Sequence, residues 1–515
     1  MKRRAWHVVA AVLVTAILFT CYWRQSLTQQ ATSDGASIAV QAWDMLHGNW
    51  LLHGWQLSDV SFYTTEIPQY ALIEAVSGLG PWVLYVAPAM TYTVLVLLAA
   101  GVAIGETRGR EGLTRALLAA GIMVAPELGY IPVTNLLGAP DHTGSAVPVL
   151  LTWLIADRCR HPGRYWIGPA AVCVILGFSY TADSIVLLTG IVPLFAACAV
   201  RVPRKRAEPR WYELSLGIAS AAALGVGLLF QWAVRQLGGY QRQGIAANVI
   251  ALRQLGRAVV VTGADLLKLF GADVANAPAG APTAFAVVHL VGLSLAVVAL
   301  GAGAWQFVRG GDLVAGGLAA GIVISLAAYM LTGHGQHAGD VREMVAVLPL
   351  GAALAGRVLG PPLAAPPRAW AAALIPALSV TGAVYLAALG YAAAQPPYLA
   401  QAQTLASWLE ARGMTGGLGG YWQSNIVTVD SGGRVTVNCA WGGKGGAFVP
   451  CGWETKASDY DPATRRATFY VMQGGGSAAA QRSADRAFGS PRQVYHVAGY
   501  TVLAWDTNLL DRLGK

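Results

Sequence analysis

The feature that most constrains this chain is a succession of apolar runs of about 17 to 25 residues, the length that crosses a bilayer as a helix. Only 12% of the 515 residues are charged, whereas a soluble protein carries about 25%. A soluble globule and a disordered chain are both excluded, because such a chain is too apolar for either. The runs predict a mainly α, polytopic membrane protein with about eleven spans. They cover 5–23, 81–105, 113–130, 142–157, 165–182, 184–200, 212–235, 284–308, 313–332, 342–359 and 370–394.

Basic residues indicate which side of the membrane each loop faces. The first run follows Lys2, Arg3 and Arg4 and lacks a small-x-small cleavage site, which favours an uncleaved helix over a signal peptide, with a cytoplasmic N-terminus. The inner loops then hold 17 of the 35 lysines and arginines, against seven on the outer side before residue 395. The net charge of +9 is thus an orientation signal. We expect a multi-pass plasma-membrane protein and no nucleic-acid partner.

Composition changes after residue 397, so we divide the chain into a transmembrane domain (1–397) and an extracytoplasmic α/β domain (398–515). Helices are expected at 401–412 and 477–488. Strands are expected at 426–429, 435–438, 467–472, 493–497 and 500–505.

Two groups of residues in this outer domain have two readings each. Cys439 and Cys451 are its only cysteines, and they either form a disulfide, as an oxidising compartment permits, or remain free thiols. Aromatic residues beside Gly-rich loops either stack against sugar rings or fill the core of a small domain. These are Tyr421, Trp422, Trp441 and Trp453.

The first outer loop, about residues 24–80, is too long for a simple linker. Apolar side chains at helical spacing from Ile38 to Leu46 predict an amphipathic helix at the membrane surface. A second helix is expected to begin at Pro68. Asp34 comes just before the first of these helices, where it is either an N-cap or a catalytic acid.

Two further outer loops carry groups suited to polar ligands. Asp141 and His142 are adjacent and can bind a cation or contact a phosphate, although Asp141 can also cap the next helix. His334, His337 and Arg342 place positive charge and several donors before the tenth span, which suits an anion better than a metal. Arg342 alternatively snorkels to the interface.

Taken together, these features resemble the GT-C superfamily of polytopic glycosyltransferases, whose donors are sugars on polyprenyl phosphate. Protein O-mannosyltransferases and the aminoarabinose transferases of lipid A are members. The shared features are an acid after the first span, a surface helix, further outer-loop acids, and an arginine opening a late span ahead of Leu348 and Pro349. Two features depart from the pattern: Asp34 has no adjacent acid, and Asp340-Val341-Arg342-Glu343 replaces the usual Arg-Tyr.

The resemblance implies an inverting transfer of a sugar to a cell-envelope acceptor at the outer face. Asp34 would be the general base that deprotonates the acceptor hydroxyl. Arg342, helped by His337 or His334, would stabilise the lipid phosphate as it leaves. The partners implied are membrane lipid, the polyprenyl-phosphate sugar and a glycan, glycolipid or protein acceptor.

Three other outer-loop acids would position that acceptor or hold a divalent cation such as Mg²⁺ or Mn²⁺. They are Asp59, Glu66 and Asp141, with His142 assisting. Asp59 and Glu66 are otherwise ordinary solvated loop acids.

Two other classes of protein remain alternatives. A multispan transporter of envelope precursors would place ionisable groups near the bilayer midplane, in related halves. The acids here gather on one side, and Asp183 and Glu127 are the nearest exceptions. An envelope-anchored protein that binds or assembles glycans would use residues 398–515 and leave Asp34 and Arg342 replaceable.

Overall fold

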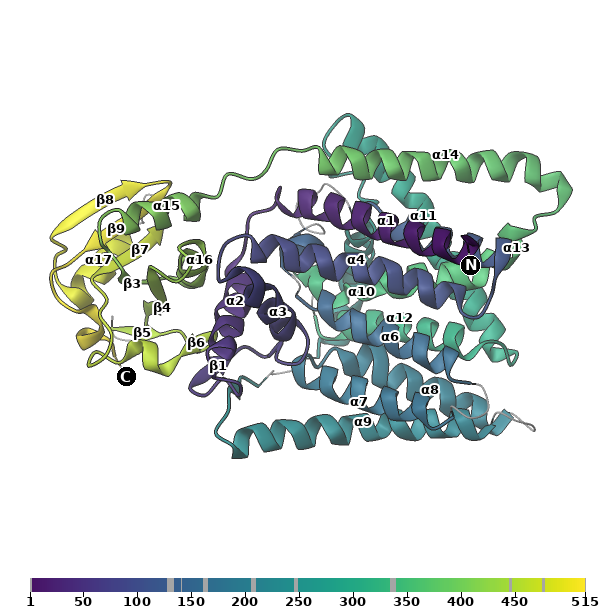
Figure 1. Cartoon of the computed structure of the whole chain (residues 1–515), viewed down its shortest axis with the longest axis horizontal. Helices are drawn as coiled ribbons and strands as arrows, with labels where there is room; N and C mark the ends of the chain where they lie inside the picture. Colours follow the sequence, from purple (N-terminus) through teal and green to yellow (C-terminus); the bar gives the residue numbers. More distant parts are fainter. Residues whose placement is uncertain are drawn as a thin grey trace. The chain divides into compact units, whose positions relative to one another are not determined.

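The computed structural model describes residues 2–126, 134–139, 141–160, 165–204, 210–244, 249–333, 340–443, 447–474 and 478–514. Contacts divide the chain into two compact units (Figure 1). The first unit comprises Met1–Gln29, Pro88–Phe230 and Ala246–Pro397, and the second comprises Gln30–Ala87, Gln231–Ile245 and Tyr398–Lys515. The first outer loop thus belongs to the same unit as the C-terminal segment. The domain boundary at residue 397, which rests on composition, stays a prediction.

The first unit is built from long apolar helices. They are α1 (Lys2–Ser26), α4 (Val83–Ile104), α5 (Gly109–Met123), α6 (Thr143–Arg158), α7 (Ile167–Ala182), α8 (Val192–Arg201), α9 (Arg210–Gln236), α10 (Leu255–Leu269), α11 (Ala281–Val308), α12 (Leu313–Leu331), α13 (Val347–Ala364) and α14 (Arg368–Ala393). Short 3-10 or π turns join several of them: η1 (Thr134–Gly138), η2 (Leu187–Ile191), η3 (Val202–Arg204), η4 (Leu252–Gln254) and η5 (Asp340–Met344).

Seven helices in the described part of the chain are long and apolar enough to cross a membrane: Val8–Ser26, Val83–Ile104, Trp211–Gln236, Ala281–Val308, Leu313–Leu331, Asp340–Ala364 and Arg368–Ala393. Helices α5 to α8 occupy the positions of the other four expected spans but are each shorter than 18 residues. The polytopic helical fold is therefore confirmed, and the count of eleven stays a prediction.

Helix α13 lies at the centre of this unit, where small residues allow close packing. A Cβ added to Gly356 would lie only 2.5 Å from the Arg115 carbonyl oxygen and 2.7 Å from the Ala103 Cβ, so α13 lies against both α5 and α4. Side chains on α1 and α14 instead remain exposed, such as Val12 and Val380. Exposed apolar faces of this kind suit lipid contact.

The second unit combines two helices of the first outer loop with a mixed sheet. Its helices are α2 (Ser33–Leu46), α3 (Glu66–Ser77), α15 (Gln401–Glu410), α16 (Ser424–Asp430) and α17 (Ala478–Phe488), with short turns η6 (Tyr421–Gln423), η8 (Ala457–Tyr460) and η9 (Leu509–Arg512). Its strands are β1 (Trp55–Leu57), β2 (Gln241–Arg242), β3 (Gly416–Gly419), β4 (Thr436–Gly442), β5 (Phe448–Pro450), β6 (Thr455–Lys456), β7 (Phe469–Gln473), β8 (Gln493–Val497) and β9 (Tyr500–Ala504).

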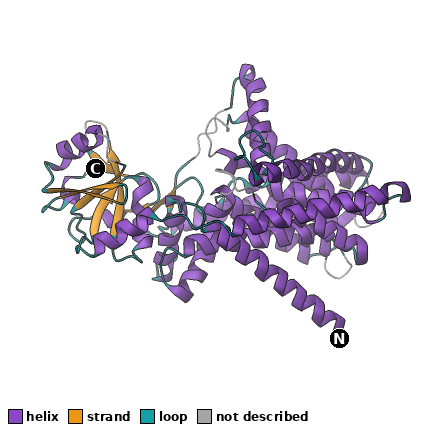
Figure 2. Ribbon diagram, turned by 90° about the horizontal axis from the view of Figure 1, so that it is seen from above, coloured by secondary structure: helices purple, strands orange, loops and turns teal. Residues whose placement is uncertain are grey.

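The strands form two sheets. The larger sheet has the order β5-β4-β3-β7-β9-β8, and its strands lie side by side in Figure 2. Strand β3 is parallel to both β4 and β7, with Leu418 opposite Asn438 and Tyr470, and the other pairs are antiparallel. Tyr470 and Phe488 share a core cluster that links this sheet to α17. The smaller sheet, β2-β1-β6, joins three segments that are distant in the sequence.

Most elements expected in this unit are present, with two corrections. Residues 426–429 were expected to form a strand, which is wrong: they lie in α16, where Ile426, Val427 and Val429 are buried. Burial of these β-branched residues overrides their strand propensity. Helix α3 begins at Glu66, two residues before Pro68, which still lies in the first turn.

Candidate functional site

Asp34 lies in the first turn of α2 and is not its N-cap. Thr32 caps the helix, its hydroxyl accepting from the Gly35 N–H at 3.4 Å. The Tyr421 hydroxyl donates to Asp34 Oδ1 at 2.5 Å, across 387 residues of sequence. The carboxylate is therefore held in one direction while the side chain stays partly exposed.

Glu454 provides a second acid to this site. Its side chain is buried, and it accepts from the Ser58 N–H at 2.9 Å and from the Gln41 amide. Burial raises the pKa of Glu454 to about 7, opposed by these hydrogen bonds and assisted by the negative charge of Asp34. Asp34 lacks an adjacent acid in the sequence, but the folded unit places Glu454 within its electrostatic reach.

Hydrogen bonds of Asn425 and an ion pair of Asp44 hold α2 against the C-terminal part of the unit. Asn425 donates to the Ser37 hydroxyl at 2.8 Å and to the Glu454 carbonyl at 3.4 Å. Asp44 accepts from Lys456 at 2.8 Å and from the Trp55 indole at 2.7 Å. These contacts fix the position of Asp34 relative to Tyr421 and Glu454.

An aromatic cluster lies beside the two acids. Tyr421 contacts Trp422 and Trp453, with ring centroids 5.1 and 6.0 Å apart, and Trp453 contacts Trp441 at 4.7 Å. Trp422 is 58% exposed and Trp441 is 36% exposed. These two rings are therefore not core residues, and their stacking against sugar rings stays a prediction.

Cys439 and Cys451 form a disulfide between β4 and the residue that follows β5. Trp441 and Trp453 lie two positions after the respective cysteines. The disulfide thus restrains the segment that carries half of the aromatic cluster.

The first unit contains a separate polar cluster at the start of α6. His142 has a left-handed backbone (φ 53°), and its side chain does not cap α6. Its Nδ1 lies 2.7 Å from Asp183 Oδ2. Asp183 ends α7 and also accepts from the Ser145 hydroxyl at 2.8 Å and from the Ile185 N–H at 3.0 Å.

This cluster continues to Arg342 through Glu343. His142 Nε2 lies 3.4 Å from one Glu343 oxygen, and Arg342 Nε lies 3.7 Å from the other. Arg342 Nη1 is also 3.7 Å from Asp141 Oδ2, and the Arg342 side chain is 44% exposed. The expected residues Asp141, His142 and Arg342 therefore lie together, and the Arg342 side chain remains partly exposed.

The other expected residues are placed differently. Glu66 is buried at the start of α3, where it accepts from the Thr65 hydroxyl, and so it is not a solvated loop acid. Asp59 is exposed in a bend of the second unit. His334 and His337 lie outside the described residues. Asp34 and Glu66 belong to the second unit, whereas Arg342 belongs to the first.

Among the residues that the structure describes, no group of three or more His, Cys, Asp or Glu side chains is arranged to hold a metal ion. The divalent cation stays a prediction, and we derive no chemical step from it.

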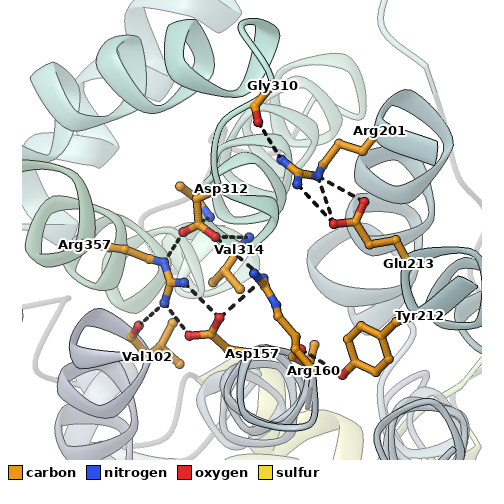
Figure 3. Close-up of polar contacts among 12 residues, drawn as sticks. Val102, Asp157, Arg160, Arg201, Tyr212, Glu213, Gly310, Asp312, Val314 and Arg357 are labelled. Carbon is orange, nitrogen blue, oxygen red and sulfur yellow. Dashed lines mark hydrogen bonds and ion pairs between the residues drawn. The ribbon is translucent and has the colours of Figure 1, made fainter. Parts of the chain in front are cut away.

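A third polar cluster lies at the opposite ends of the first unit's helices (Figure 3). The Arg357 guanidinium donates to both oxygens of Asp157, at 2.7 and 3.0 Å, and to Asp312. Asp157 lies fifteen residues after His142, roughly 22 Å along α6. Nearby, Arg201 pairs with Glu213 at 3.1 Å. Asp157 and Glu213 are buried and Asp312 is half-buried. Arginines neutralise all three acids, and the cluster links helix ends that the sequence assigns to the cytoplasmic side.

Sequence reasoning missed three members of these clusters. Glu454 and Glu343 belong to no local pattern, and the pairing of Asp183 with His142 joins two helix ends 41 residues apart. Only Asp183 gave a signal, as an acid between two abutting apolar runs.

Comparisons with known proteins identify the fold. No protein-family model matches the sequence, and no curated protein matches it. The structure is similar to ArnT from Cupriavidus metallidurans in the apo state (TM-score 0.60, 13% identity, covering 100% of both chains). It is also similar to the same ArnT bound to undecaprenyl phosphate (TM-score 0.59, 13% identity, covering 98% of this chain and 99% of that one).

A third similar structure is the Archaeoglobus fulgidus oligosaccharyltransferase in the apo form (TM-score 0.50, 11% identity, covering 92% of this chain and 70% of that one). ArnT is an aminoarabinose transferase, and both neighbours belong to the GT-C superfamily. The expected GT-C fold is therefore confirmed, and with it a multi-pass membrane architecture.

Proposed function

We propose that this chain is an integral membrane glycosyltransferase that moves a sugar from a polyprenyl-phosphate donor to a cell-envelope acceptor at the outer face. The observation that carries the proposal is the Asp34 carboxylate, oriented by the Tyr421 hydroxyl beside Glu454. The GT-C fold supports it, since the ArnT neighbour was solved with undecaprenyl phosphate.

Asp34 acts as the general base of a single displacement. The Tyr421 hydroxyl donates a hydrogen bond to Oδ1 of Asp34. The other carboxylate oxygen, Oδ2, is therefore left to accept the proton of the acceptor hydroxyl. The acceptor oxygen then forms a bond to the anomeric carbon, and the bond from that carbon to the lipid phosphate breaks. The electron pair leaves with the phosphate, and the anomeric centre inverts. Glu454 acts as a positioning residue because it holds α2 through Gln41.

Arg342 stabilises the lipid phosphate as it leaves. Its side chain is 44% exposed, so a phosphate can approach the guanidinium, which also lies 3.7 Å from Asp141 and 3.7 Å from Glu343. His334 and His337 are proposed to assist. The His142–Asp183 pair fixes the orientation of Glu343 and thereby of Arg342.

The acceptor is proposed to bind across the exposed tryptophans, because sugar faces pack on aromatic rings. Asp59, Glu66, Asp141 and His142 would position it or hold a divalent cation. The N-terminus is proposed to be cytoplasmic and residues 398–515 extracytoplasmic. The disulfide supports this orientation, because disulfides persist in oxidising compartments.

The test is sugar transfer by the full chain in proteoliposomes supplied with a polyprenyl-phosphate sugar. Asp34→Asn should lower kcat by about 10²- to 10⁴-fold, the usual loss on removing a general base. Tyr421→Phe should lower kcat less, because the carboxylate remains. Asp506→Asn is the matched control, since Asp506 is an exposed acid paired with Arg492.

Full transfer by Asp34→Asn would refute the mechanism. Movement of an envelope precursor across the vesicle membrane without formation of a glycosidic bond would instead support a transporter. Glycan binding that survives both Asp34→Asn and Arg342→Ala, without transfer by the wild type, would support an envelope-binding protein.

A further inference from the structure

A polar cavity of about 160 Å³ lies within the second unit, beyond the residues used above. It is formed by the last turns of α9 and the segment that follows, and its polar lining comprises Gln231, Arg235, Tyr240, Arg242 and Gln243. Since a water molecule occupies about 30 Å³ of liquid, the cavity has room for one tetrahedral oxyanion.

The chemistry of this lining favours an anion. Two guanidinium groups and two amides surround the cavity, and none of its lining residues is acidic. Guanidinium groups bind phosphate and carboxylate oxygens with paired hydrogen bonds. The negative end of the α9 dipole also lies here, but two full positive charges outweigh about half a charge.

Tyr240 lies between the two arginines in the sequence and lines the same cavity. Its side chain is buried and packs on Tyr63, with ring centroids 4.9 Å apart. Burial raises the pKa of Tyr240, and the positive charges of Arg242 and Arg235 both oppose that rise. Both arginines line one cavity together with this buried phenol.

The small sheet attaches the cavity to the candidate catalytic acids. Arg242 lies in β2, opposite Leu57 of β1, and β1 pairs in turn with β6, which follows Glu454 directly. Gln243 also donates to the Gly452 carbonyl at 2.5 Å. A ligand in the cavity would therefore be held by the same framework that positions Glu454.

We infer that this cavity binds a phosphate group carried by the acceptor, and that the enzyme selects phosphorylated acceptors. The choice of the acceptor as source rests on the proposed function; the presence of an oxyanion site does not. The cavity is distinct from Arg342, which belongs to the other unit.

The first experiment measures binding of inorganic phosphate to the full chain in nanodiscs of phosphatidylcholine, by calorimetry at low salt. The Arg235→Gln/Arg242→Gln double variant should bind about 100-fold more weakly, or about tenfold for each guanidinium group that the substitutions remove. Arg482→Gln, which changes an exposed arginine on α17, is the matched control and should bind as the wild type does. Unchanged binding by the double variant would overturn the site.

The second experiment separates the sources of the phosphate. Inorganic phosphate should raise the apparent KM for acceptor in the wild type, without changing kcat, and should have no such effect in the double variant. If nanodiscs containing phosphatidylglycerol abolish phosphate binding, the cavity binds a bilayer headgroup and the acceptor assignment is wrong. Asp34→Asn should bind phosphate normally, so failure of the transfer mechanism and failure of this site give different results.

Discussion

Replacing Glu454 by Gln should remove a large pH dependence from the stability of this protein. Burial raises the pKa of Glu454 from its ordinary 4.5 to about 7. Each unit of pKa shift corresponds to about 1.4 kcal/mol, so the shift amounts to about 3 kcal/mol. Because the folded state binds this proton more tightly than the unfolded state, the stabilisation is complete below pH 4.5 and is lost as the pH rises through 7.

The full chain is denatured in detergent at several pH values between 4.5 and 8, and its unfolding is monitored by tryptophan fluorescence. The free energy of unfolding of the wild type should fall across this range by about 3 kcal/mol more than that of Glu454→Gln. Burial also raises the pKa of Asp430 to about 7 and that of Glu74 to about 9, so the difference between wild type and variant is the quantity to compare. Glu410→Gln, which alters a surface pair with Arg434, should keep the wild-type slope.

Equal slopes in wild type and Glu454→Gln would refute the assignment of a buried acid that titrates near neutrality. The pH dependence of kcat provides a second test of this assignment, because the glutamine in Glu454→Gln cannot ionise beside Asp34. The variant should lose a transition near pH 7 that the wild type and Glu410→Gln both show.

Three further predictions concern stability, each measured by denaturation in detergent. The Cys439→Ala/Cys451→Ala variant should lose about 3 kcal/mol, because the disulfide closes a loop with a sequence separation of 12; a reductant should destabilise the wild type similarly and leave the variant unchanged. Arg357→Ala should cost about 3–5 kcal/mol, since it leaves the buried Asp157 with only the longer Arg160 contact of 3.4 Å, and adding Asp157→Asn should recover part of the loss. Glu74→Met should stabilise by about 1–3 kcal/mol, because Glu74 is buried with neither carboxyl oxygen hydrogen-bonded among the described residues.

The helical part of the fold was predictable because bilayer-length apolar runs are a local signal. Helix α7 ends at Ala182, where the first of two abutting runs ends, and η2 and α8 together cover most of the second run. Residues 426–429 were mispredicted because a short β-branched run has the same local pattern in a strand and in a buried helical turn. Their burial in α16 depends on neighbours that are distant in the sequence.

The candidate site was predictable only in part, because its contacts are non-local. Asp34 was identifiable by its place just ahead of the surface helix, whereas its hydrogen bond with Tyr421 spans 387 residues. The contact between Gln41 and Glu454 spans 413 residues. Single-sequence patterns report neighbours within a helix or strand, so they cannot select partners at such separations.

Backbone strain provides an independent argument for the two clusters. Among the described residues, five that are not glycine have positive φ, and two of them are His142 and Glu454, both at 53°. Glycine would adopt this conformation without the cost of about 1–2 kcal/mol that an L side chain incurs. Each of these positions instead carries an ionisable side chain that is buried and held by hydrogen bonds or an ion pair. Strain of this kind persists where surrounding contacts enforce it. Leu52, Phe62 and Ala498 have the same backbone conformation without an ionisable side chain, so it is the combination of strain with buried polar contacts that distinguishes His142 and Glu454.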